Sequence, residues 1–174
     1  MSTTELVAQP ANAITAAQAG TALQTTNRPD TRQFLTFRVG EEEYGLDILR
    51  VQEIRSYEPP TRIANAPIFV KGVVNLRGVI VPIVDLRLRL GQTGDYNAFT
   101  VVIVLNVCNR VVGIVVDSVS DVLELTADEI KARPEVPAAL DAKFITGLGK
   151  LTDRMLILLD IEAMVQSPDF GLMD

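Results

Sequence analysis

Few residues in this chain could do chemistry, because histidine is absent and cysteine occurs once, at Cys108. The absence of histidine removes the commonest general base and metal ligand, and with it Ser–His and Cys–His nucleophile pairs. A single cysteine leaves almost nothing from which to build a transition-metal site. It also excludes an intramolecular disulfide, which fits a reducing cytoplasm. We interpret Cys108 as a small apolar residue near a turn rather than as a redox centre.

Four carboxylates lie next to predicted strand ends and are the remaining candidates for catalysis: Asp85, Asp117, Asp121 and Asp160. A hydrolase without histidine needs two such groups to converge on a substrate. Each acid has a structural alternative, in a hairpin, in a turn or at a helix N-cap. The run 147–149 is too short for a dinucleotide fingerprint, and no P-loop motif occurs. The sequence therefore predicts no enzyme, no cofactor and no metal site.

The most distinctive polar group is an arginine at the tip of a β-hairpin predicted within residues 71–87. Two runs of β-branched residues flank a polar tip, Asn75 to Gly78, in which Gly78 supplies the positive φ of a tight turn. Pro82 cannot donate to a ladder, so the second arm must bend, bulge or lie at an edge. Arg77 can serve a partner interface or a structural ion pair, to Asp85 or a nearby glutamate. The flanking aliphatic residues favour the interface.

Composition limits the class of protein. The 174 residues are enough for one domain, or for two small subdomains that share a core. Aromatic residues are only 5% of the chain, so that core must be aliphatic. The net charge of −6 argues against a nucleic-acid partner, because phosphate binding needs a basic face. The apolar runs are too short to span a bilayer, and the N-terminus lacks the pattern of a secretory signal, so we expect no direct membrane insertion.

The first part of the chain divides into a polar tail and a set of short strands. Residues 1–32 are rich in Ala, Thr and Gln and predict a disordered tail, with a docking helix as the alternative. Strands are expected over 34–39, 44–47 and 51–57, with one helical turn over 48–50. In the third strand the alternation places Val51, Glu53 and Arg55 on one face. Neither face of that strand is purely apolar, which indicates an edge or a surface that meets a partner.

The rest of the chain continues the same pattern. A short helix capped by Asn65 is expected over 65–70, and the second hairpin arm is expected to continue over 85–90. Further strands are expected over 99–107, 111–116, 122–125, 144–151 and 155–159, with turns at 109–110 and at 117–121. Thr126 and Glu129 form a capping box that starts a helical turn. An irregular crossing at 133–141 and a helix over 161–166, capped by Asp160, complete the chain.

About ten short strands with glycine-containing turns, and no helical crossover, predict antiparallel barrels. The loop at 91–97 divides the predicted strands about equally, which suggests two small barrels within a domain over 33–166. Residues 167–174 are expected to form a C-terminal tail. The fold class is therefore all-β, with short helices and a C-terminal helix.

The run 75–87, NLRGVIVPIVDLR, resembles the signature of the CheW coupling proteins of bacterial chemotaxis. Residues 34–55, 61–72, 101–125 and 148–158 also follow the pattern of that family in order. The resemblance covers about 33–165, is closest to the enterobacterial type, and leaves out the N-terminal tail. It implies two five-stranded SH3-like β-barrels packed on a shared hydrophobic core, with no catalytic activity.

The same resemblance implies a function as an adaptor. Such a protein links the cytoplasmic tip of methyl-accepting chemotaxis receptors to the regulatory domain of the histidine autokinase CheA, in arrays at the inner membrane. The groove between the barrels would receive the receptor tip, and barrel ends would meet the kinase. The family's contact positions correspond here to Val51, Glu53, Gly72, Arg77 and Val122.

Two alternatives to this function remain open from the sequence. The nearer one is the same fold in another receptor–kinase pathway, such as pili-based motility or gene regulation. The other is a small β-barrel enzyme that uses carboxylates, against which the absence of histidine argues.

Overall fold

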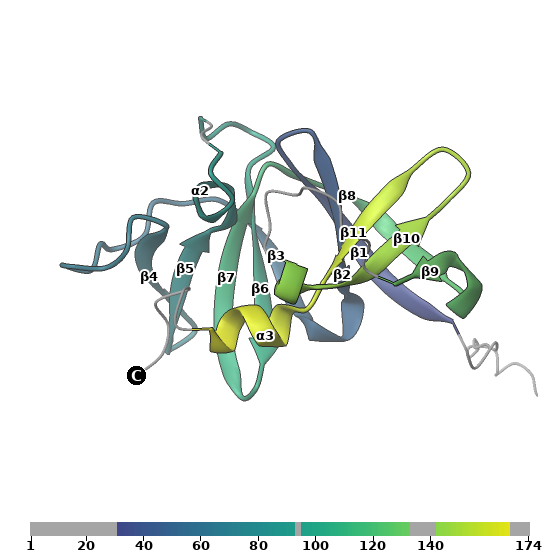
Figure 1. Ribbon diagram of the computed structural model, residues 1–174. Coiled ribbons are helices and arrows are strands. Elements are labelled where there is room, and N and C mark those ends of the chain that lie inside the picture. The colour runs from purple at the N-terminus through teal and green to yellow at the C-terminus, as the bar shows by residue number, and fades with distance from the viewer. Residues whose placement is uncertain (1–30, 93–94, 133–141, 168–174) are drawn as a thin grey trace, which may run out of the picture. The chain divides into compact units, whose positions relative to one another are not determined.

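The computed structural model describes residues 31–92, 95–132 and 142–167 (Figure 1). The elements that follow all belong to one compact unit, Arg32–Asp174. Almost all of the predicted tail at 1–32, the predicted crossing at 133–141 and residues 168–174 lie outside the described residues.

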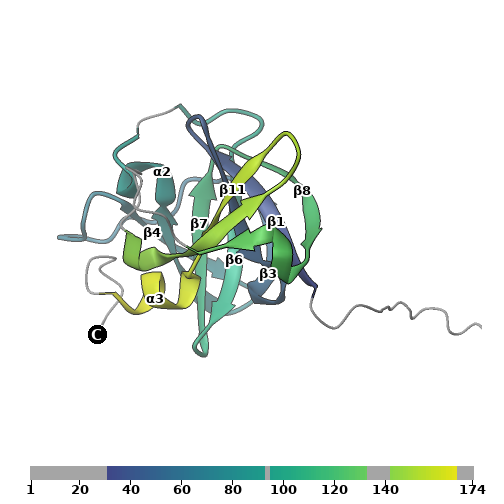
Figure 2. The ribbon, with the colours of Figure 1, turned by 45° about the vertical axis from the view of Figure 1, so that its right-hand side comes forward.

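In the described part of the chain, eleven strands form two sheets, which Figures 1 and 2 show on either side of a common interior. Sheet A has the order β8–β1–β2–β11–β10–β9. Its strands are β1 (Arg32–Val39), β2 (Glu42–Asp47), β8 (Ser118–Leu125), β9 (Ile130–Lys131), β10 (Ile145–Lys150) and β11 (Met155–Leu159). Neighbouring strands of sheet A are antiparallel except β2 and β11, which pair in parallel at Tyr44–Ile157 and Gly45–Leu158.

Sheet B contains the strands from the middle of the chain, in the order β3–β6–β7–β5–β4. They are β3 (Val51–Ser56), β4 (Val70–Leu76), β5 (Val79–Asp85), β6 (Val101–Val107) and β7 (Arg110–Val116). Here β5 and β7 form the parallel pair, over Ile83 to Asp85. Pro82 lies just before that stretch, so its missing N–H falls where β5 pairs with β4 alone.

Short helical segments connect the strands, and one more follows β11. They are η3 (Ile48–Arg50), α2 (Leu86–Arg89), η4 (Ala127–Glu129), η5 (Ala142–Phe144) and α3 (Ile161–Gln166). The helical turn at 48–50, the capping box of Thr126 with Glu129 and the final helix are confirmed. Asp160 caps α3 as predicted, because its carboxylate accepts a hydrogen bond from the Ala163 N–H at 3.0 Å.

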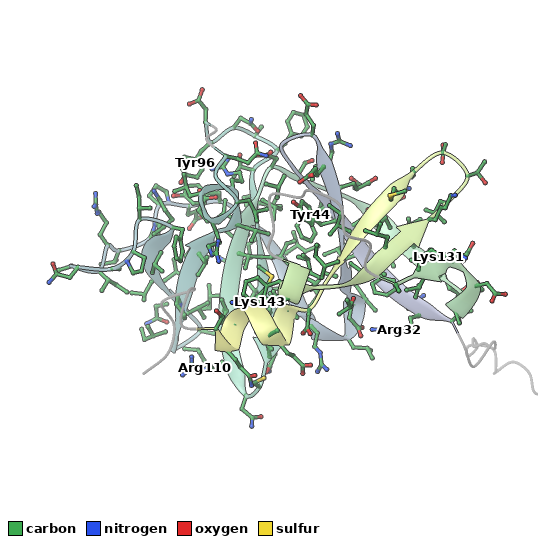
Figure 3. All side chains as sticks on the ribbon, in the orientation of Figure 1. Arg32, Tyr44, Tyr96, Arg110, Lys131 and Lys143 are labelled. Atoms are coloured by element: carbon green, nitrogen blue, oxygen red, sulfur yellow. The ribbon has the colours of Figure 1, made fainter. Side chains whose placement is uncertain are left out.

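The largest hydrophobic cluster lies between the two sheets and draws on both. It includes Phe37 and Leu46 of sheet A, Ile103 and Ile114 of sheet B, and Met164 of α3. Tyr44 is also buried in this cluster (Figure 3). Each sheet also has one smaller hydrophobic cluster on its other face. The predicted fold class, all-β with two SH3-like β-barrels on a shared hydrophobic core, is therefore confirmed, although β9 makes sheet A six-stranded where five strands were expected.

The chain is divided between the sheets differently from our prediction. The predicted boundary at 91–97 falls between α2 and β6, and the strands on its two sides, β5 and β6, both belong to sheet B. The chain instead changes sheet between β2 and β3, and again between β7 and β8. Sheet A is thus built from both ends of the described part of the chain, which a division at 91–97 could not produce.

Two predicted elements are wrong. No helix forms over 65–70, because Asn65 has φ of 65°, whereas an N-cap residue needs an extended backbone. The second hairpin arm does not continue beyond Asp85, because the Asp85 carboxylate accepts a hydrogen bond from the Arg87 N–H at 3.0 Å and caps α2. A carboxylate directly after a strand can cap a helix, and here it does so.

Several turns are shifted by one or more residues from their predicted places. The hairpin tip is the two-residue loop of Arg77 and Gly78, with φ values of 53° and 90°. Cys108 and Asn109, rather than Asn109 and Arg110, form the turn between β6 and β7. Strand β8 begins at Ser118, so Asp117 alone separates it from β7.

Candidate functional site

Arg77 stands at the tip of the β4–β5 hairpin and forms an ion pair with Glu53 of β3. Positive φ at both loop residues is the signature of a type I′ turn, whose twist matches that of the flanking strands. The Asn75 carboxamide accepts a hydrogen bond from the Gly78 N–H at 2.8 Å and fixes the turn from inside. The side chain of Arg77 is 66% exposed. The guanidinium is thus held in place while it remains accessible to a partner.

Glu53 is the centre of this cluster, because Arg55 also pairs with it at 3.5 Å. The hydrogen bond from Arg77 lowers the pKa of the Glu53 carboxyl, and Arg55 contributes in the same direction. Strands β3 and β4 are the two edges of sheet B. The Arg77–Glu53 pair therefore connects the two edges of sheet B, because Arg77 directly follows β4 and Glu53 lies on β3.

A small cleft of about 70 Å³ lies between these edges, lined by Arg55, Glu58, Val74, Asn75 and other residues. Its floor contains Leu76, Val102 and Val104 of the outer cluster of sheet B. Ile54, Val79 and Ile80, which adjoin the ion pair in sequence, are exposed. The hairpin tip thus combines charge with aliphatic surface, a composition that suits a protein interface better than catalysis.

Val51 lies on a different face of β3 from Glu53, contrary to the predicted alternation. The register shifts between these residues, so Val51 pairs with Leu105 and Glu53 pairs with Val104. Val51 packs against the cluster between the sheets, whereas Val104 belongs to the outer cluster. A β-bulge of this kind cannot be seen in the residue pattern alone.

Gly72 is buried within β4, where the chain adopts φ of +144°. A Cβ atom at this position would overlap the carbonyl of Thr61. Thr61 pairs with Val73 through two backbone hydrogen bonds of 2.9 and 2.8 Å. Close packing against Thr61 thus requires glycine at position 72, and the residue is buried rather than on the surface.

Val122 lies on β8, an edge strand of sheet A, and is 49% exposed. It pairs with Leu35 of β1. Glu53 and Arg77 are therefore in direct contact, whereas Val122 lies on the other sheet and Gly72 is buried. The five residues expected at the interfaces form one close pair and three separate positions.

The four candidate acids are all held by structural partners. Asp85 and Asp117 converge on Arg87 of α2, at 3.0 and 3.2 Å, and the side chain of Arg87 is only 3% exposed. Asp117 also accepts from the Gly40 N–H at 2.7 Å, so Arg87 connects sheet B to the β1–β2 turn of sheet A. The hydrogen bonds that Arg87 donates to Asp85 raise the pKa of Arg87.

Asp121, the third acid, pairs with Arg154, which also holds Glu43. The hydrogen bonds from Arg154 and Thr36 lower the pKa of Asp121. Asp160 caps α3. No group of three or more His, Cys, Asp and Glu side chains in the described part of the chain could hold a metal ion.

Sequence reasoning missed a stacked tyrosine pair. The Tyr57 ring, just after β3, lies parallel to the Tyr96 ring with centroids 4.0 Å apart. Tyr96 lies close to α2 (Figure 3), where its hydroxyl donates to Asp85 at 3.0 Å and its ring meets the Arg87 guanidinium at 4.7 Å. Burial raises the pKa of the Tyr96 hydroxyl. The two tyrosines lie 39 positions apart in the sequence, and no local pattern relates them.

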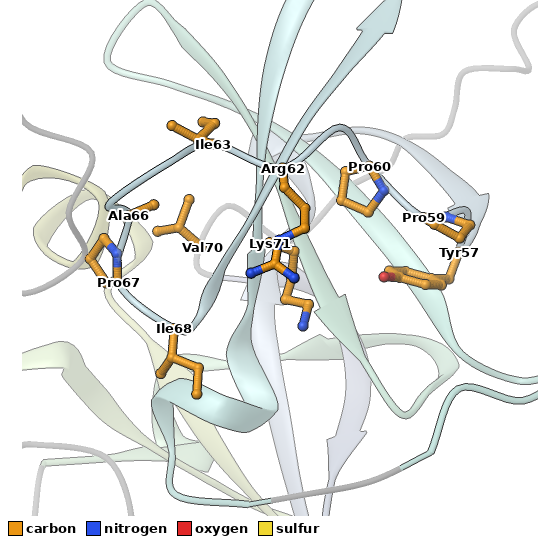
Figure 4. A pocket seen from close by; sticks show the side chains of 10 residues that line it. All are labelled: Tyr57, Pro59, Pro60, Arg62, Ile63, Ala66, Pro67, Ile68, Val70 and Lys71. Atoms are coloured by element: carbon orange, nitrogen blue, oxygen red, sulfur yellow. The ribbon is translucent and has the colours of Figure 1, made fainter.

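A second hollow, also missed, lies under the connection from β3 to β4. It has a volume of about 290 Å³ and is lined by Tyr57, Pro59, Pro60, Arg62, Ile63, Ala66, Pro67, Ile68, Val70 and Lys71 (Figure 4). The three prolines in this segment could have indicated a rigid connection from the sequence alone.

The geometry defines a class of protein, a two-sheet β domain whose accessible features suit binding. Its buried charges are paired, and its exposed features are ion pairs, aliphatic residues and small hollows. Within the described ranges, no helix is long and apolar enough to cross a membrane.

Comparison with known proteins gives the family. The model of the CheW-like domain matches residues 33–169. The chain is 59% identical over 144 residues to the chemotaxis protein CheW of Klebsiella aerogenes, covering 82% of this chain and 87% of that protein. It is 39% identical to the probable chemotaxis protein CheW of Rhizobium etli, covering 82% and 92%.

The fold comparison agrees with the sequence comparison. The crystal structure of the scaffolding protein TtCheW from Thermoanaerobacter tengcongensis matches with a TM-score of 0.73 and 29% identity, covering 79% of this chain and 94% of that one. The chain belongs to the CheW-like family. Its similarity to the Klebsiella protein supports the enterobacterial type.

Proposed function

We propose that this chain is a non-enzymatic chemotaxis adaptor that couples methyl-accepting receptors to the histidine autokinase CheA and transmits the state of the receptor to the kinase. Its relatives are named chemotaxis proteins, and the solved relative is described as a scaffolding protein. The protein would act in the cytoplasm and reach receptor arrays at the inner membrane through its partners, without inserting into the bilayer and without binding nucleic acid.

The observation that carries this proposal is the Arg77–Glu53 pair at the hairpin tip. An exposed guanidinium that is already held by an internal carboxylate loses little conformational freedom when it binds. Arg55 and exposed aliphatic residues lie beside it in sequence. Arginine with adjoining apolar surface is the usual composition of an interface anchor.

The mechanism follows from coupling between binding sites. An adaptor changes the activity of a kinase only if it binds the active and inactive states with different affinities. A rigid body with a shared core, such as this pair of sheets, can transmit a change at one surface to another. Modest interfaces would be strengthened by multivalency in an array.

Co-sedimentation with receptor-containing membranes and CheA, combined with a kinase assay with and without this protein, tests the proposal. We expect a ternary complex and receptor-dependent kinase activity only when the protein is present. Absence of a complex, together with unchanged kinase output, would refute the adaptor function.

Variants of the ion pair separate binding from positioning. We expect Arg77→Ala to weaken receptor-dependent kinase control while the circular dichroism spectrum and melting temperature stay close to those of the parent. The double variant Arg77→Glu with Glu53→Arg restores the internal pair with reversed polarity. Failure of this double variant to restore control would show that Arg77 or Glu53 itself contacts a partner, whereas full rescue would assign the pair a positioning role. A large fall in the melting temperature of Arg77→Ala would contradict the interface assignment.

A further inference from the structure

The hollow between β3 and β4 has an ordered arrangement of chemical groups. In the view of Figure 4, Ile63, Ala66, Pro67 and Ile68 lie on one side, and Tyr57 and two prolines lie on the other. Arg62 and Lys71 lie between these two apolar sides. The volume of about 290 Å³ is at the lower limit for ligand pockets, so the hollow suits one or two side chains better than a cofactor.

The walls of the hollow are held firmly. Thr61 is bonded to Val73 at one end of the connection, and the Val70 N–H donates to the Pro67 carbonyl at 3.0 Å at the other. The Asp85 N–H donates to the Phe69 carbonyl at 2.7 Å and joins the connection to β5. Three prolines restrict the backbone further. A preformed site of this kind loses little entropy when it is occupied.

The two cations have no carboxylate partner among the described residues, although the chain carries a net charge of −6. Lys71 faces the ring of Tyr96 at 5.9 Å, and the structure shows no ion pair for Arg62 or Lys71 in the described ranges. By contrast, Arg32, Arg77 and Arg154, whose side chains are also at least partly exposed, each form an ion pair with a carboxylate. The nearby Glu58 lines the other cleft instead.

Exposed aliphatic groups adjoin these cations. Ile68 is 79% exposed and Ile63 is 45% exposed, although both are large apolar residues. A surface with apolar side chains beside an unpaired positive charge is complementary to a partner that presents a carboxylate beside apolar side chains.

We propose that this hollow is a docking site for a segment of another protein in which a carboxylate is flanked by large aliphatic residues. The carboxylate would lie between Arg62 and Lys71, and the two aliphatic side chains would pack against Ile63 and Ile68 on one side and against Tyr57 on the other. The site shares no lining residue with the cleft beside Arg77 and Glu53, so it is an additional surface.

The experiment uses the full-length chain and a defined probe. A fluorescently labelled, capped heptapeptide, Gly-Ser-Leu-Glu-Leu-Ser-Gly, is titrated by fluorescence anisotropy, together with the same peptide carrying Gln in place of Glu. We expect the Glu peptide to bind with Kd of about a millimolar or tighter. The Gln peptide should bind about tenfold more weakly, because it cannot form charge-assisted hydrogen bonds.

Three variants locate the binding. Arg62→Glu and Lys71→Glu should each weaken binding of the Glu peptide about fivefold or more, because an attraction becomes a repulsion. Lys150→Glu, on the exposed end of β10, is the matched control and should change the affinity by less than about twofold. Ile68→Ser tests the aliphatic wall and should also weaken binding. Circular dichroism confirms that each variant is folded.

Several results would overturn the proposal. They are the absence of saturable binding of the Glu peptide, equal affinity for the Gln peptide, or an equal loss with Lys150→Glu and with Arg62→Glu. Because the assay contains neither receptor nor kinase, its outcome is independent of the adaptor function proposed above.

Discussion

At the scale of single residues, Gly72 shows that packing can dictate the residue type at a position that was expected to contact a partner. Its φ of +144° and the adjacent Thr61 carbonyl leave no room for a side chain. We expect Gly72→Ala to lower the free energy of unfolding by about 3 kcal/mol or more, because it combines strain with a backbone clash.

Gly78→Ala is the matched control for that prediction. Gly78 also has positive φ, at +90°, but no heavy atom beyond Gly78 and its two chain neighbours lies within 4 Å of the position of a Cβ. Only the conformational cost of about 1–2 kcal/mol should then appear. Chemical denaturation of both variants measures the difference, and equal losses would show that the Thr61 contact is unimportant.

The titration of Glu53 is a second prediction at this scale. Its pKa in the folded protein is lowered chiefly by the hydrogen bond from Arg77. A lowered folded pKa means that the pair stabilises the protein above the ordinary pKa of a glutamate, and that this contribution is lost as the pH falls through the lowered value.

NMR titration of the Glu53 carboxyl should therefore show its pKa rising toward the ordinary value in Arg77→Ala. Arg32→Ala, which removes a surface pair with Asp47, is the control and should leave the pKa of Glu53 unchanged. An unchanged pKa in Arg77→Ala would mean that the pair does not persist in solution. At neutral pH Glu53 is ionised in both proteins, so any loss of signalling in Arg77→Ala is not a protonation effect.

At the scale of elements, the buried pair of Asp85 and Arg87 fixes where strand β5 ends and α2 begins. Arg87 is 2% exposed and Asp85 is 1% exposed, and Tyr96 completes the hydrogen bonding of the carboxylate. Removal of one member of a buried pair leaves an uncompensated charge. We expect Arg87→Met to lower the free energy of unfolding by about 3–5 kcal/mol.

Arg32→Met provides the comparison, because Arg32 also pairs with an aspartate but its side chain is 56% exposed. That variant should lose no more than about 1 kcal/mol. Urea unfolding of both proteins measures the two effects. A loss in Arg87→Met as small as that in Arg32→Met would mean that water reaches the Asp85 carboxylate.

The elements themselves were predictable where the signal was local. Runs of β-branched residues marked most strands, and Asp160, Thr126 and Gly78 marked a helix start, a capping box and a turn. The sequence also indicated a glutamate or Asp85 as the partner of Arg77, and the partner is Glu53. Asp85 pairs with Arg87 instead, because a strand end turns there into a helix.

Contacts between distant segments were not predictable from one sequence. The parallel pairing of β2 with β11 joins residues more than 100 positions apart, and nothing in either strand specifies the other. The bulge that separates Val51 from Glu53 and the stack of Tyr57 on Tyr96 depend in the same way on neighbours that only the folded chain provides. The sequence could therefore suggest single candidate residues for an interface, but not which of them lie close together in space.

At the scale of the whole molecule, the shared core makes the two sheets interdependent. Sheet B is contained in residues 48–117, but its inner face packs on Phe37, Leu46 and other residues of sheet A. We expect a fragment of residues 48–117 to bind the dye ANS and to lack a cooperative thermal transition, because half of that core is missing. The intact chain should unfold in a single transition. Cooperative unfolding of the fragment would show that sheet B is an independent domain.

The edges of both sheets have a consequence for the behaviour of the protein at high concentration. An uncovered strand edge is a template on which a second chain can add, which leads to aggregation. Here β3 carries Glu53 and Arg55, β8 carries Asp121 and Glu124, β9 has only two residues, and Thr61 pairs with β4. The same charges and bridge that shape the candidate surfaces thereby protect the chain from edge-to-edge aggregation.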